Sequence, residues 1–350
     1  MDKLYPYYKN IKNAIETKST NTYLPLSIQL NILNKCYQRC IGCRKPDWPD
    51  VKLPKDIVLN IIQWANFNPA NTVVFSGGDP PAHENFIEFL ETAHNIGLGT
   101  GTLTACLWGS RFNTEKFVIN SNWISISIDG ASEKIYTATR GVNTLKSVKE
   151  NIKLLNKLKN EYNPNLRIRC NSTISTVNIH EMKDILTMCN EELEIENNFY
   201  PLHTWSELQV NNIDKNKVKE YVDEALCVKT KYKTNIKSFI SLLDRKTPPL
   251  CIMPWVHIFC DANGDILNCC RMARDNGSFI RDPSIVMGNV LQEDINKIWI
   301  SERAKKIRNR VYNAQESVCK MCDRYNVANW NYDDWLQASQ NSSITEKVFL

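Results

Sequence analysis

The sequence predicts an α/β fold: a partial (β/α)6 TIM-type barrel followed by a small cysteine-rich domain. Three observations predict it. Residues from about 25 to 212 read as strands that alternate with helices. The cysteine and glycine motifs of this region follow strands, which is where functional residues lie in parallel α/β sheets. From about residue 246 onward the regular segments are short, and six of the thirteen cysteines occur there.

Residues 1–24 are predicted to be an N-terminal extension, and residues 25–212 the barrel. The first strand is expected at 26–33, where Ile28, Leu30 and Ile32 share one face. Further strands are expected at 72–76, 98–104, 123–128, 166–174 and 194–202. Helices are expected between them at 54–66, 84–95, 145–158 and 180–190. Strand–helix–strand units with right-handed crossovers give a parallel sheet, and six of them can curl into a partial barrel.

Three further parts are predicted after the barrel. Residues 213–245 are lysine-rich and helical, and we interpret them as a bridge. Residues 246–330 form the small second domain, and residues 331–350 form a C-terminal tail. Trp330, Tyr332 and Trp335 favour packing of the end of the chain against the barrel.

Composition indicates an ordinary cytoplasmic protein. Of 350 residues, 43% are hydrophobic, and the net charge of +5 arises from 43 basic and 38 acidic residues spread along the chain. This charge gives no nucleic-acid footprint. The N-terminus lacks the apolar core of a signal peptide, and no apolar run reaches the roughly 20 residues of a membrane helix. In the cytoplasm, clustered cysteines favour metal ligation over disulfides.

The first cysteine cluster reads CxxxCxxC, at Cys36, Cys40 and Cys43, directly after the first predicted strand. Three thiolates on one loop suit three irons of a [4Fe–4S] cubane and leave its fourth iron open. An open iron allows the cluster to bind and reduce a ligand. Zinc is the alternative, but structural zinc sites usually take four ligands in paired short spacings.

This motif in this position resembles the signature of the radical S-adenosylmethionine (SAM) superfamily. The segment Gly77-Gly78-Asp79-Pro80 follows the second predicted strand and resembles the family's GGEP segment. The resemblance implies that these four residues bind the SAM amino group. Two glycines allow a close approach of the backbone, and an acid or a carbonyl accepts from an ammonium. The acid here is aspartate, whereas the family has glutamate.

A second stretch resembles the SxDG…RG pattern of the peptide-modifying branch of that superfamily. It contains Ser127, Asp129 and Arg140. The resemblance implies that Ser127 and Asp129 lie near the ribose or carboxylate of SAM. Arg140 is expected to pair with a carboxylate, with a surface salt bridge as the alternative. The family often has an aromatic residue before the third cysteine, where this chain has Gly42.

The second cysteine cluster resembles the C-terminal iron–sulfur extension called SPASM, or its shorter form, Twitch. The matching pattern is C-x12-G-x4-C followed by a later CxxC. The resemblance implies one auxiliary [4Fe–4S] cluster held by Cys251, Cys269, Cys319 and Cys322. The position of the next SPASM cysteine holds Ala328 instead. Cys260 and Cys270 are alternative ligands, and a zinc ribbon is the alternative site.

The resemblance implies a radical SAM oxidoreductase or maturase with two [4Fe–4S] clusters and SAM as cofactors. Such an enzyme cleaves SAM reductively to a 5′-deoxyadenosyl radical, which takes hydrogen from an unactivated C–H bond. Oxidative modification of a ribosomal peptide is the leading hypothesis. Dehydrogenation of a sugar or cyclitol alcohol is the second, and a non-catalytic iron–sulfur or zinc scaffold is the third.

The expected partners are the substrate and an electron donor such as flavodoxin or ferredoxin, with no nucleic-acid or membrane partner. No single side chain receives a catalytic role from the sequence.

Overall fold

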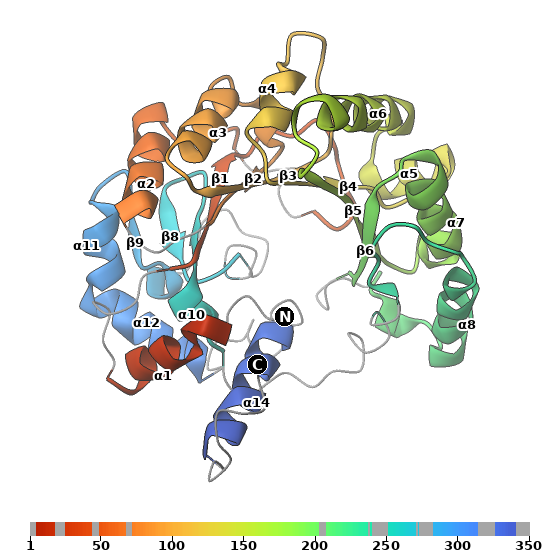
Figure 1. Ribbon diagram of the computed structural model, residues 1–350. Coiled ribbons are helices and arrows are strands. Elements are labelled where there is room, and N and C mark those ends of the chain that lie inside the picture. Colours follow the sequence, from red (N-terminus) through yellow and green to blue (C-terminus); the bar gives the residue numbers. More distant parts are fainter. Residues whose placement is uncertain are drawn as a thin grey trace.

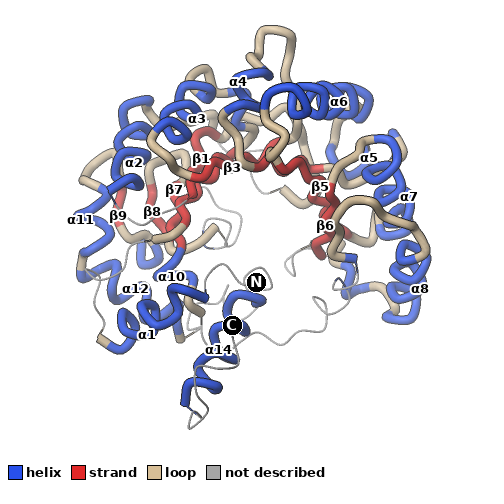
Figure 2. Tube along the Cα trace, in the orientation of Figure 1, coloured by secondary structure: helices blue, strands red, loops and turns tan. Residues whose placement is uncertain are grey.

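The computed structural model describes residues 5–17, 25–43, 49–67, 72–202, 208–236, 239, 251–270, 272, 283–313 and 326–340. Strands line the inside of an open arc and helices cover its outside (Figures 1 and 2). This arrangement confirms the predicted α/β partial barrel with a small C-terminal domain.

Within the described residues, one sheet contains nine strands in the order β6-β5-β4-β3-β2-β1-β7-β8-β9. Strands β1 to β6 pair in parallel with their neighbours. Their observed ends lie within two residues of the predicted ends. The strands are β1 (Ser27–Leu33), β2 (Thr72–Gly77), β3 (Gly99–Thr104), β4 (Trp123–Ser127), β5 (Arg167–Ile174), β6 (Glu196–Pro201), β7 (His257–Cys260), β8 (Asp265–Leu267) and β9 (Gly288–Asn289).

Helices α2 to α8 follow the outside of the arc, and α10 to α12 surround β7, β8 and β9 (Figure 1). Seven of these helices are additional to those that the sequence predicts: α1, α4, α5, α10, α11, α12 and α14. The helices are α1 (Tyr8–Glu16), α2 (Lys55–Phe67), α3 (Phe86–Asn95), α4 (Thr114–Ile119), α5 (Glu133–Arg140), α6 (Leu145–Tyr162), α7 (Met182–Thr187), α8 (Lys215–Leu226), α10 (Met253–Val256), α11 (Ile295–Ile300), α12 (Glu302–Tyr312) and α14 (Asn326–Gln340).

The two faces of the barrel sheet differ in polarity. Outward side chains such as Ile28, Phe75 and Ile126 are fully buried beneath the helices. Because side chains alternate along a strand, their neighbours point into the arc. The strand register places mostly polar residues on that inner face, among them Gln29, Asn31, Ser76, Ser125, Ser127, Arg169 and Asn171. The inside of the barrel therefore offers a polar surface.

The small C-terminal domain continues the barrel sheet. Strand β7 pairs in parallel with β1, so that Ile258 lies opposite Ile28. Strands β8 and β9 then add in antiparallel order. Across the junction, the amide Nδ2 of Asn31 donates to Oδ1 of Asp261 at 2.7 Å, and both side chains are buried. The two domains thus share one sheet and a buried polar contact.

Helices from the two ends of the chain pack together on the small domain. The ring of Tyr8 in α1 lies 5.3 Å from the ring of Tyr332 and 5.6 Å from that of Trp335, both in α14. Ile252 and Trp255 belong to the same buried cluster. Aromatic side chains therefore join segments that are more than 300 residues apart in the sequence.

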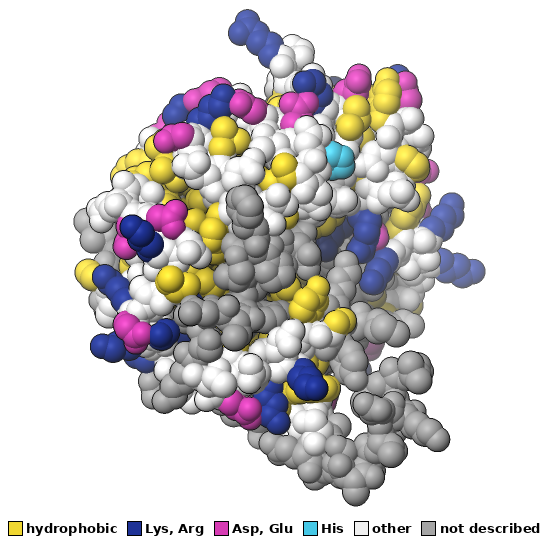
Figure 3. Space-filling model, turned by 60° about the vertical axis from the view of Figure 1, so that its left-hand side comes forward, with side chains coloured by type: hydrophobic (Ala, Val, Ile, Leu, Met, Phe, Trp, Pro, Cys, Tyr) yellow, Lys and Arg dark blue, Asp and Glu magenta, His cyan; other side chains and the backbone are white. Residues whose placement is uncertain are grey.

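Acidic and basic side chains are interspersed on the face of the molecule shown in Figure 3. None of the described helices combines the length and the apolar character that a membrane crossing requires.

His257 on β7 makes stability dependent on pH. The side chain is buried, and burial lowers its pKa to about 4 from the usual 6.5. Because the unfolded chain binds this proton more tightly, the stabilisation is present above about pH 6.5 and is lost towards pH 4. We expect a loss of about 3 kcal/mol in the free energy of unfolding between these values. Urea unfolding should show this loss in the wild type and a smaller one in His257→Gln; equal losses would contradict the assignment.

Candidate functional site: a cysteine loop at the carboxyl end of the barrel

The loop after β1 carries the first three cysteines. Cys36 and Cys40 are partly exposed, and Cys43 is exposed. The backbone N–H of Gln38 donates to Sγ of Cys36 at 3.4 Å, and the N–H of Cys43 donates to the carbonyl of Cys40 at 3.0 Å. Cys40 and Cys43 lie near enough to Cys36 to influence its pKa. The structure thus brings the three predicted ligands together on one loop.

The environment of these thiols favours their protonated form when no metal is considered. Burial raises the pKa of Cys36 to about 12, and burial also raises the pKa of Cys40. Arg140 opposes the shift at Cys40 through its charge and a hydrogen bond. A bound metal ion reverses such a preference, because a coordinating thiol is deprotonated outright.

The glycine turn after β2 packs directly on the start of the cysteine loop. The N–H of Gly78 donates to the carbonyl of Leu33 at 2.7 Å, and the N–H of Asp79 donates to that of Lys35 at 2.9 Å. A Cβ on Gly78 would lie 2.0 Å from the Lys35 carbonyl oxygen. Gly77 has φ of +134°, which L side chains rarely adopt. Both glycines therefore allow a close contact between two backbone segments.

Asp79 is fully buried, and its carboxylate holds the end of β3. Its Oδ1 accepts from Oγ1 of Thr104 at 2.5 Å and from the N–H of Ala105 at 3.1 Å. Burial raises the pKa of Asp79 to about 7, although these hydrogen bonds oppose the shift. Its Oδ2 is also buried and has no hydrogen-bond partner among the described residues. Because the side chain is fully buried, the neighbouring residues would have to move before a ligand donor such as an ammonium could reach this oxygen.

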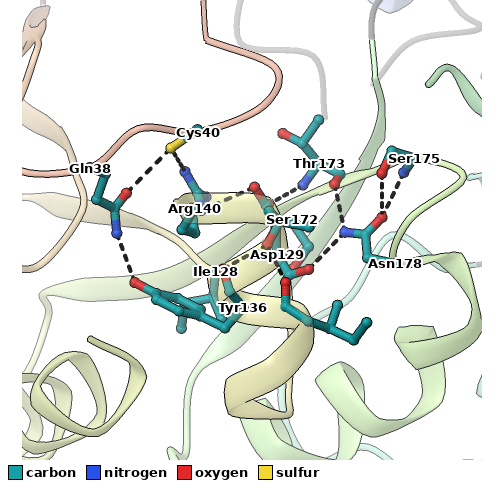
Figure 4. A network of polar contacts seen from close by, with 12 residues as sticks. Gln38, Cys40, Ile128, Asp129, Tyr136, Arg140, Ser172, Thr173, Ser175 and Asn178 are labelled. Carbon is teal, nitrogen blue, oxygen red and sulfur yellow. Dashed lines mark hydrogen bonds and ion pairs between the residues drawn. The ribbon is translucent and has the colours of Figure 1, made fainter. Parts of the chain in front are cut away.

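Asp129 and Arg140 form a buried ion pair beside the cysteine loop (Figure 4). Nε of Arg140 lies 3.0 Å from Oδ2 of Asp129, and the side chains are about nine-tenths buried. Nη1 of Arg140 donates to Sγ of Cys40 at 3.4 Å. Oδ1 of Asp129 accepts from the N–H of Thr173 at 2.6 Å. Arg140 therefore pairs with a carboxylate, and it does so in the interior instead of at the surface.

The charges of this pair depend on each other. Burial raises the pKa of Asp129, while Arg140 and the Thr173 N–H offset part of that shift. Burial also disfavours the charge of Arg140, but Asp129 and Cys40 outweigh it and hold the Arg140 pKa above its ordinary value. Arg140 thus remains cationic next to a thiol of the loop.

Helix α5 fixes the far side of the cysteine loop through its last turn. The N–H of Arg39 donates to the carbonyl of Arg140 at 2.9 Å, and the N–H of Ile41 donates to that of Thr139 at 3.0 Å. Ser132 caps the start of the helix, where its side chain accepts from the N–H of Ile135, and Gly141, with φ of +72°, caps its end. The loop is therefore held by β2 on one side and by α5 on the other.

Three supporting residues of the site are absent from the sequence predictions. Thr104 binds Asp79, Tyr136 accepts from Nε2 of Gln38 at 2.7 Å, and Asn178 donates to the carbonyl of Asp129 at 2.7 Å. Of these three residues, only Thr104 has a feature that marks it in the sequence, because it is a polar residue at the carboxyl end of a predicted strand. Tyr136 and Asn178 act from helix α5 and from a turn after β5.

The donor set of the loop fits an iron–sulfur cubane. Within the described ranges, no three histidine, cysteine or acidic side chains are grouped closely enough to hold one metal ion. The thiolates of a cubane bind different irons, so their sulfurs need not converge on one ion. Cys36, Cys40 and Cys43 would hold such a cluster, with the guanidinium of Arg140 directed at the sulfur of Cys40.

Removing the charge of Arg140 should destabilise the protein. Arg140→Gln would leave the Asp129 carboxylate buried without its cation, which typically costs about 3 kcal/mol or more. Arg167→Gln is the matched control, because Arg167 pairs with Glu196 at a more exposed position. An exposed pair contributes about 1 kcal/mol at most. Urea unfolding of the two anaerobically reconstituted variants measures the loss of unfolding free energy in each. Equal losses would show that the Arg140–Asp129 pair stabilises the protein no more than an exposed pair does.

The auxiliary cysteines are only partly described. Cys251 precedes α10 and is partly buried, while Cys269 follows β8 and is buried. The alternative ligands Cys260 and Cys270 are also buried. The predicted ligands Cys319 and Cys322 lie outside the described residues. The auxiliary ligand set therefore stays a prediction.

Family models match two parts of the chain. The Radical SAM superfamily model matches residues 30–188, and the SPASM model, described as an iron–sulfur cluster-binding domain, matches residues 251–323. The first match contains the cysteine loop, the glycine turn and Arg140. The second contains all four predicted auxiliary ligands.

A curated relative is the PqqA peptide cyclase of Bradyrhizobium diazoefficiens. The alignment is 24% identical over 170 residues, 47% of this chain and 43% of that protein. The chain thus matches less than half the length of this relative.

Solved structures share the fold over most of the chain. SuiB of Streptococcus suis bound to S-adenosylmethionine matches with a TM-score of 0.64 and 16% identity, covering 92% of this chain and 78% of SuiB. SuiB bound to the precursor peptide SuiA gives a TM-score of 0.64 and 15% identity, covering 92% and 77%. The enzyme anSMEcpe with bound AdoMet gives 0.60 and 12%, covering 91% and 100%. At these identities the likeness establishes the fold.

Proposed function

We propose that this chain, a member of the radical SAM superfamily with a C-terminal SPASM iron–sulfur domain, oxidatively modifies a ribosomally made peptide. It would do so by cleaving SAM and taking a hydrogen atom from an unactivated C–H bond of that peptide. The observation that carries the proposal is the cysteine loop itself. Three thiols stand on a short loop that is fixed on both sides, next to an acidic glycine turn and a buried guanidinium.

Cys36, Cys40 and Cys43 would hold the cluster, which when bound would supply the electron for reductive cleavage of SAM and so the radical chemistry for hydrogen abstraction. The chain's own residues position the ligand. The turn formed by Gly77, Gly78, Asp79 and Pro80 would bind the amino group of SAM, through its carbonyls or through the Asp79 carboxylate. Ser127 lies on the inner face of β4, at the end where SAM would bind. Asp129 and Arg140 would lie beside the ribose or carboxylate of SAM, and Arg140 also contacts the loop at Cys40.

Two features support a peptide as the substrate. The inner face of the barrel is polar and partly exposed, which suits a hydrophilic chain. The relatives named above include a peptide cyclase and a structure that contains a precursor peptide. The SPASM domain would hold an auxiliary cluster and offer a sink for the electron of the substrate radical, which favours net oxidation. Flavodoxin or ferredoxin would supply the electron for SAM cleavage.

Anaerobic reconstitution tests the enzymatic part of this proposal. With three plus four cysteine ligands we expect two cubanes, or about eight irons per chain. After reduction, the protein should convert SAM into 5′-deoxyadenosine and methionine. A folded protein that binds zinc, or that binds iron and leaves SAM intact, would refute the enzymatic function.

A second experiment tests the substrate class. A short open reading frame beside the gene would encode the peptide, and co-expression should change the mass of that peptide by the loss of hydrogen atoms. An unchanged peptide together with normal SAM cleavage would direct the search to a small-molecule alcohol.

A further inference from the structure

An arginine and a tryptophan form a stacked pair on the inner face of the barrel. The ring of Trp123 in β4 lies over Gly101 in β3, where a Cβ would come within 2.0 Å of the ring. The guanidinium carbon of Arg169 in β5 lies 4.7 Å from the centre of that ring. Both side chains are partly exposed. The ring of Trp123 can pack against the backbone of β3 because Gly101 has no side chain. The guanidinium of Arg169 in turn stacks on that ring.

Among the described residues, the guanidinium of Arg169 makes few polar contacts. Its Nε lies 3.4 Å from Oγ of Ser125, which is a long contact for a hydrogen bond. Within the described ranges, no carboxylate lies within ion-pair distance of Arg169. Burial lowers the pKa of Arg169, and the charge of Glu196, which lies opposite it in the register of β5 and β6, offsets part of that shift. Glu196 is the acid of this region, and Arg167 binds it with two contacts of 3.1 and 2.6 Å. The guanidinium of Arg169 thus stacks on an aromatic ring, and most of its N–H donors have no hydrogen-bond partner within the part of the chain that the structure describes.

The place of Arg169 on the sheet connects it to the proposed SAM site. Arg169 stands two residues before Asn171, and Asn171 lies opposite Ser127 in the register of β4 and β5. All three positions face the inside of the arc. Two residues of strand span about 7 Å, so Arg169 lies roughly that far below the layer of Ser127. A molecule bound at Arg169 would therefore extend towards the carboxyl end of the barrel.

We propose that Arg169, supported by Trp123, binds a carboxylate of the peptide substrate and so sets its position in the barrel. This inference rests on the proposed function. A guanidinium has a planar fork of donors that matches a carboxylate, and stacking on an aromatic ring keeps the fork oriented. The carboxylate comes from an acidic side chain or from the C-terminus of the peptide.

Three pools of short peptides with random neutral sequences distinguish these sources. The first pool carries one glutamate and an amidated C-terminus, the second one glutamine and a free C-terminus, and the third one glutamine and an amidated C-terminus. The reconstituted full-length protein is immobilised under anaerobic conditions with SAM, and mass spectrometry compares the retained peptides. Arg169→Gln removes the proposed ligand, and Arg167→Gln removes one positive charge from the same strand and face as a matched control.

We expect the wild type to enrich one carboxylate pool over the neutral pool about tenfold, which corresponds to about 1.4 kcal/mol. The enriched pool identifies the source of the carboxylate. Arg169→Gln should abolish the enrichment, and Arg167→Gln should retain it. The inference is wrong if the wild type shows no enrichment, or if both variants behave alike.

A further measurement, the dependence of 5′-deoxyadenosine formation on SAM concentration, tests whether Arg169 binds SAM instead of the peptide. If Arg169→Gln raises the SAM concentration required, the guanidinium binds the carboxylate of SAM, and the inference is overturned. If the wild type forms no 5′-deoxyadenosine at all, the proposed function fails, whereas the peptide comparison still reports on Arg169. The two failures are therefore distinguishable.

Discussion

Replacing Cys36, Cys40 and Cys43 together with alanine should abolish the formation of 5′-deoxyadenosine and remove about half of the bound iron. The three thiols lie on one loop, and they are the ligands proposed for the cluster with the open iron. The auxiliary cluster takes its ligands from the other domain, so about four of about eight irons should remain. Iron and sulfide counts, with chromatographic detection of 5′-deoxyadenosine, measure both effects.

Cys227→Ala is the matched control for this experiment. Cys227 is an exposed thiol at the end of α8, outside both proposed clusters. The Cys227→Ala variant should therefore bind as much iron and cleave SAM as fast as the wild type. If SAM cleavage survived in the triple variant, or if both clusters disappeared together, the assignment of the loop would have to be abandoned.

Gly78→Ala should lower SAM cleavage by about 100-fold, the scale associated with a misplacement of about 1 Å in an active site. The new Cβ would lie 2.0 Å from the carbonyl oxygen of Lys35 and 2.4 Å from that of Asn34. Both are backbone atoms at the start of the cysteine loop, so a side-chain rotation cannot relieve the clash. The loop would have to move away from the turn, and with it Cys36. Iron content and initial rates of 5′-deoxyadenosine formation measure this change.

Gly109→Ala makes the same chemical change where a Cβ would have no atom within 4 Å. It should behave as the wild type. Full iron content and full activity in Gly78→Ala would show that the contact between the turn and the loop is dispensable.

The barrel is predictable from the sequence because its strands are local patterns. Alternation of apolar residues at Ile28, Leu30 and Ile32 marks β1, and a similar alternation at Ile124 and Ile126 marks β4. The cysteine loop and the glycine turn follow strands, so a parallel sheet brings them to one edge. The sequence therefore predicts that these two motifs meet at the carboxyl edge of the sheet.

The sequence does not predict which residues each motif contacts. The glycines of the turn predict a close approach to a ligand, and the structure adds a close approach to the backbone of residues 33–35. The contact of Arg140 with Cys40 joins residues 100 positions apart. The pairing of Tyr8 with Tyr332 spans almost the whole chain. Such contacts depend on how the elements assemble, which local composition does not encode.

The parallel pairing of β7 with β1 has a consequence for dissecting this protein. With β7 in place, both sides of β1 are hydrogen-bonded to neighbouring strands. A fragment truncated before β7 would expose one side of a seven-residue, almost entirely buried strand as an unpaired edge. Unprotected edges recruit other chains into intermolecular sheets. The barrel expressed by itself should therefore aggregate, and the chain is best treated as a single folding unit.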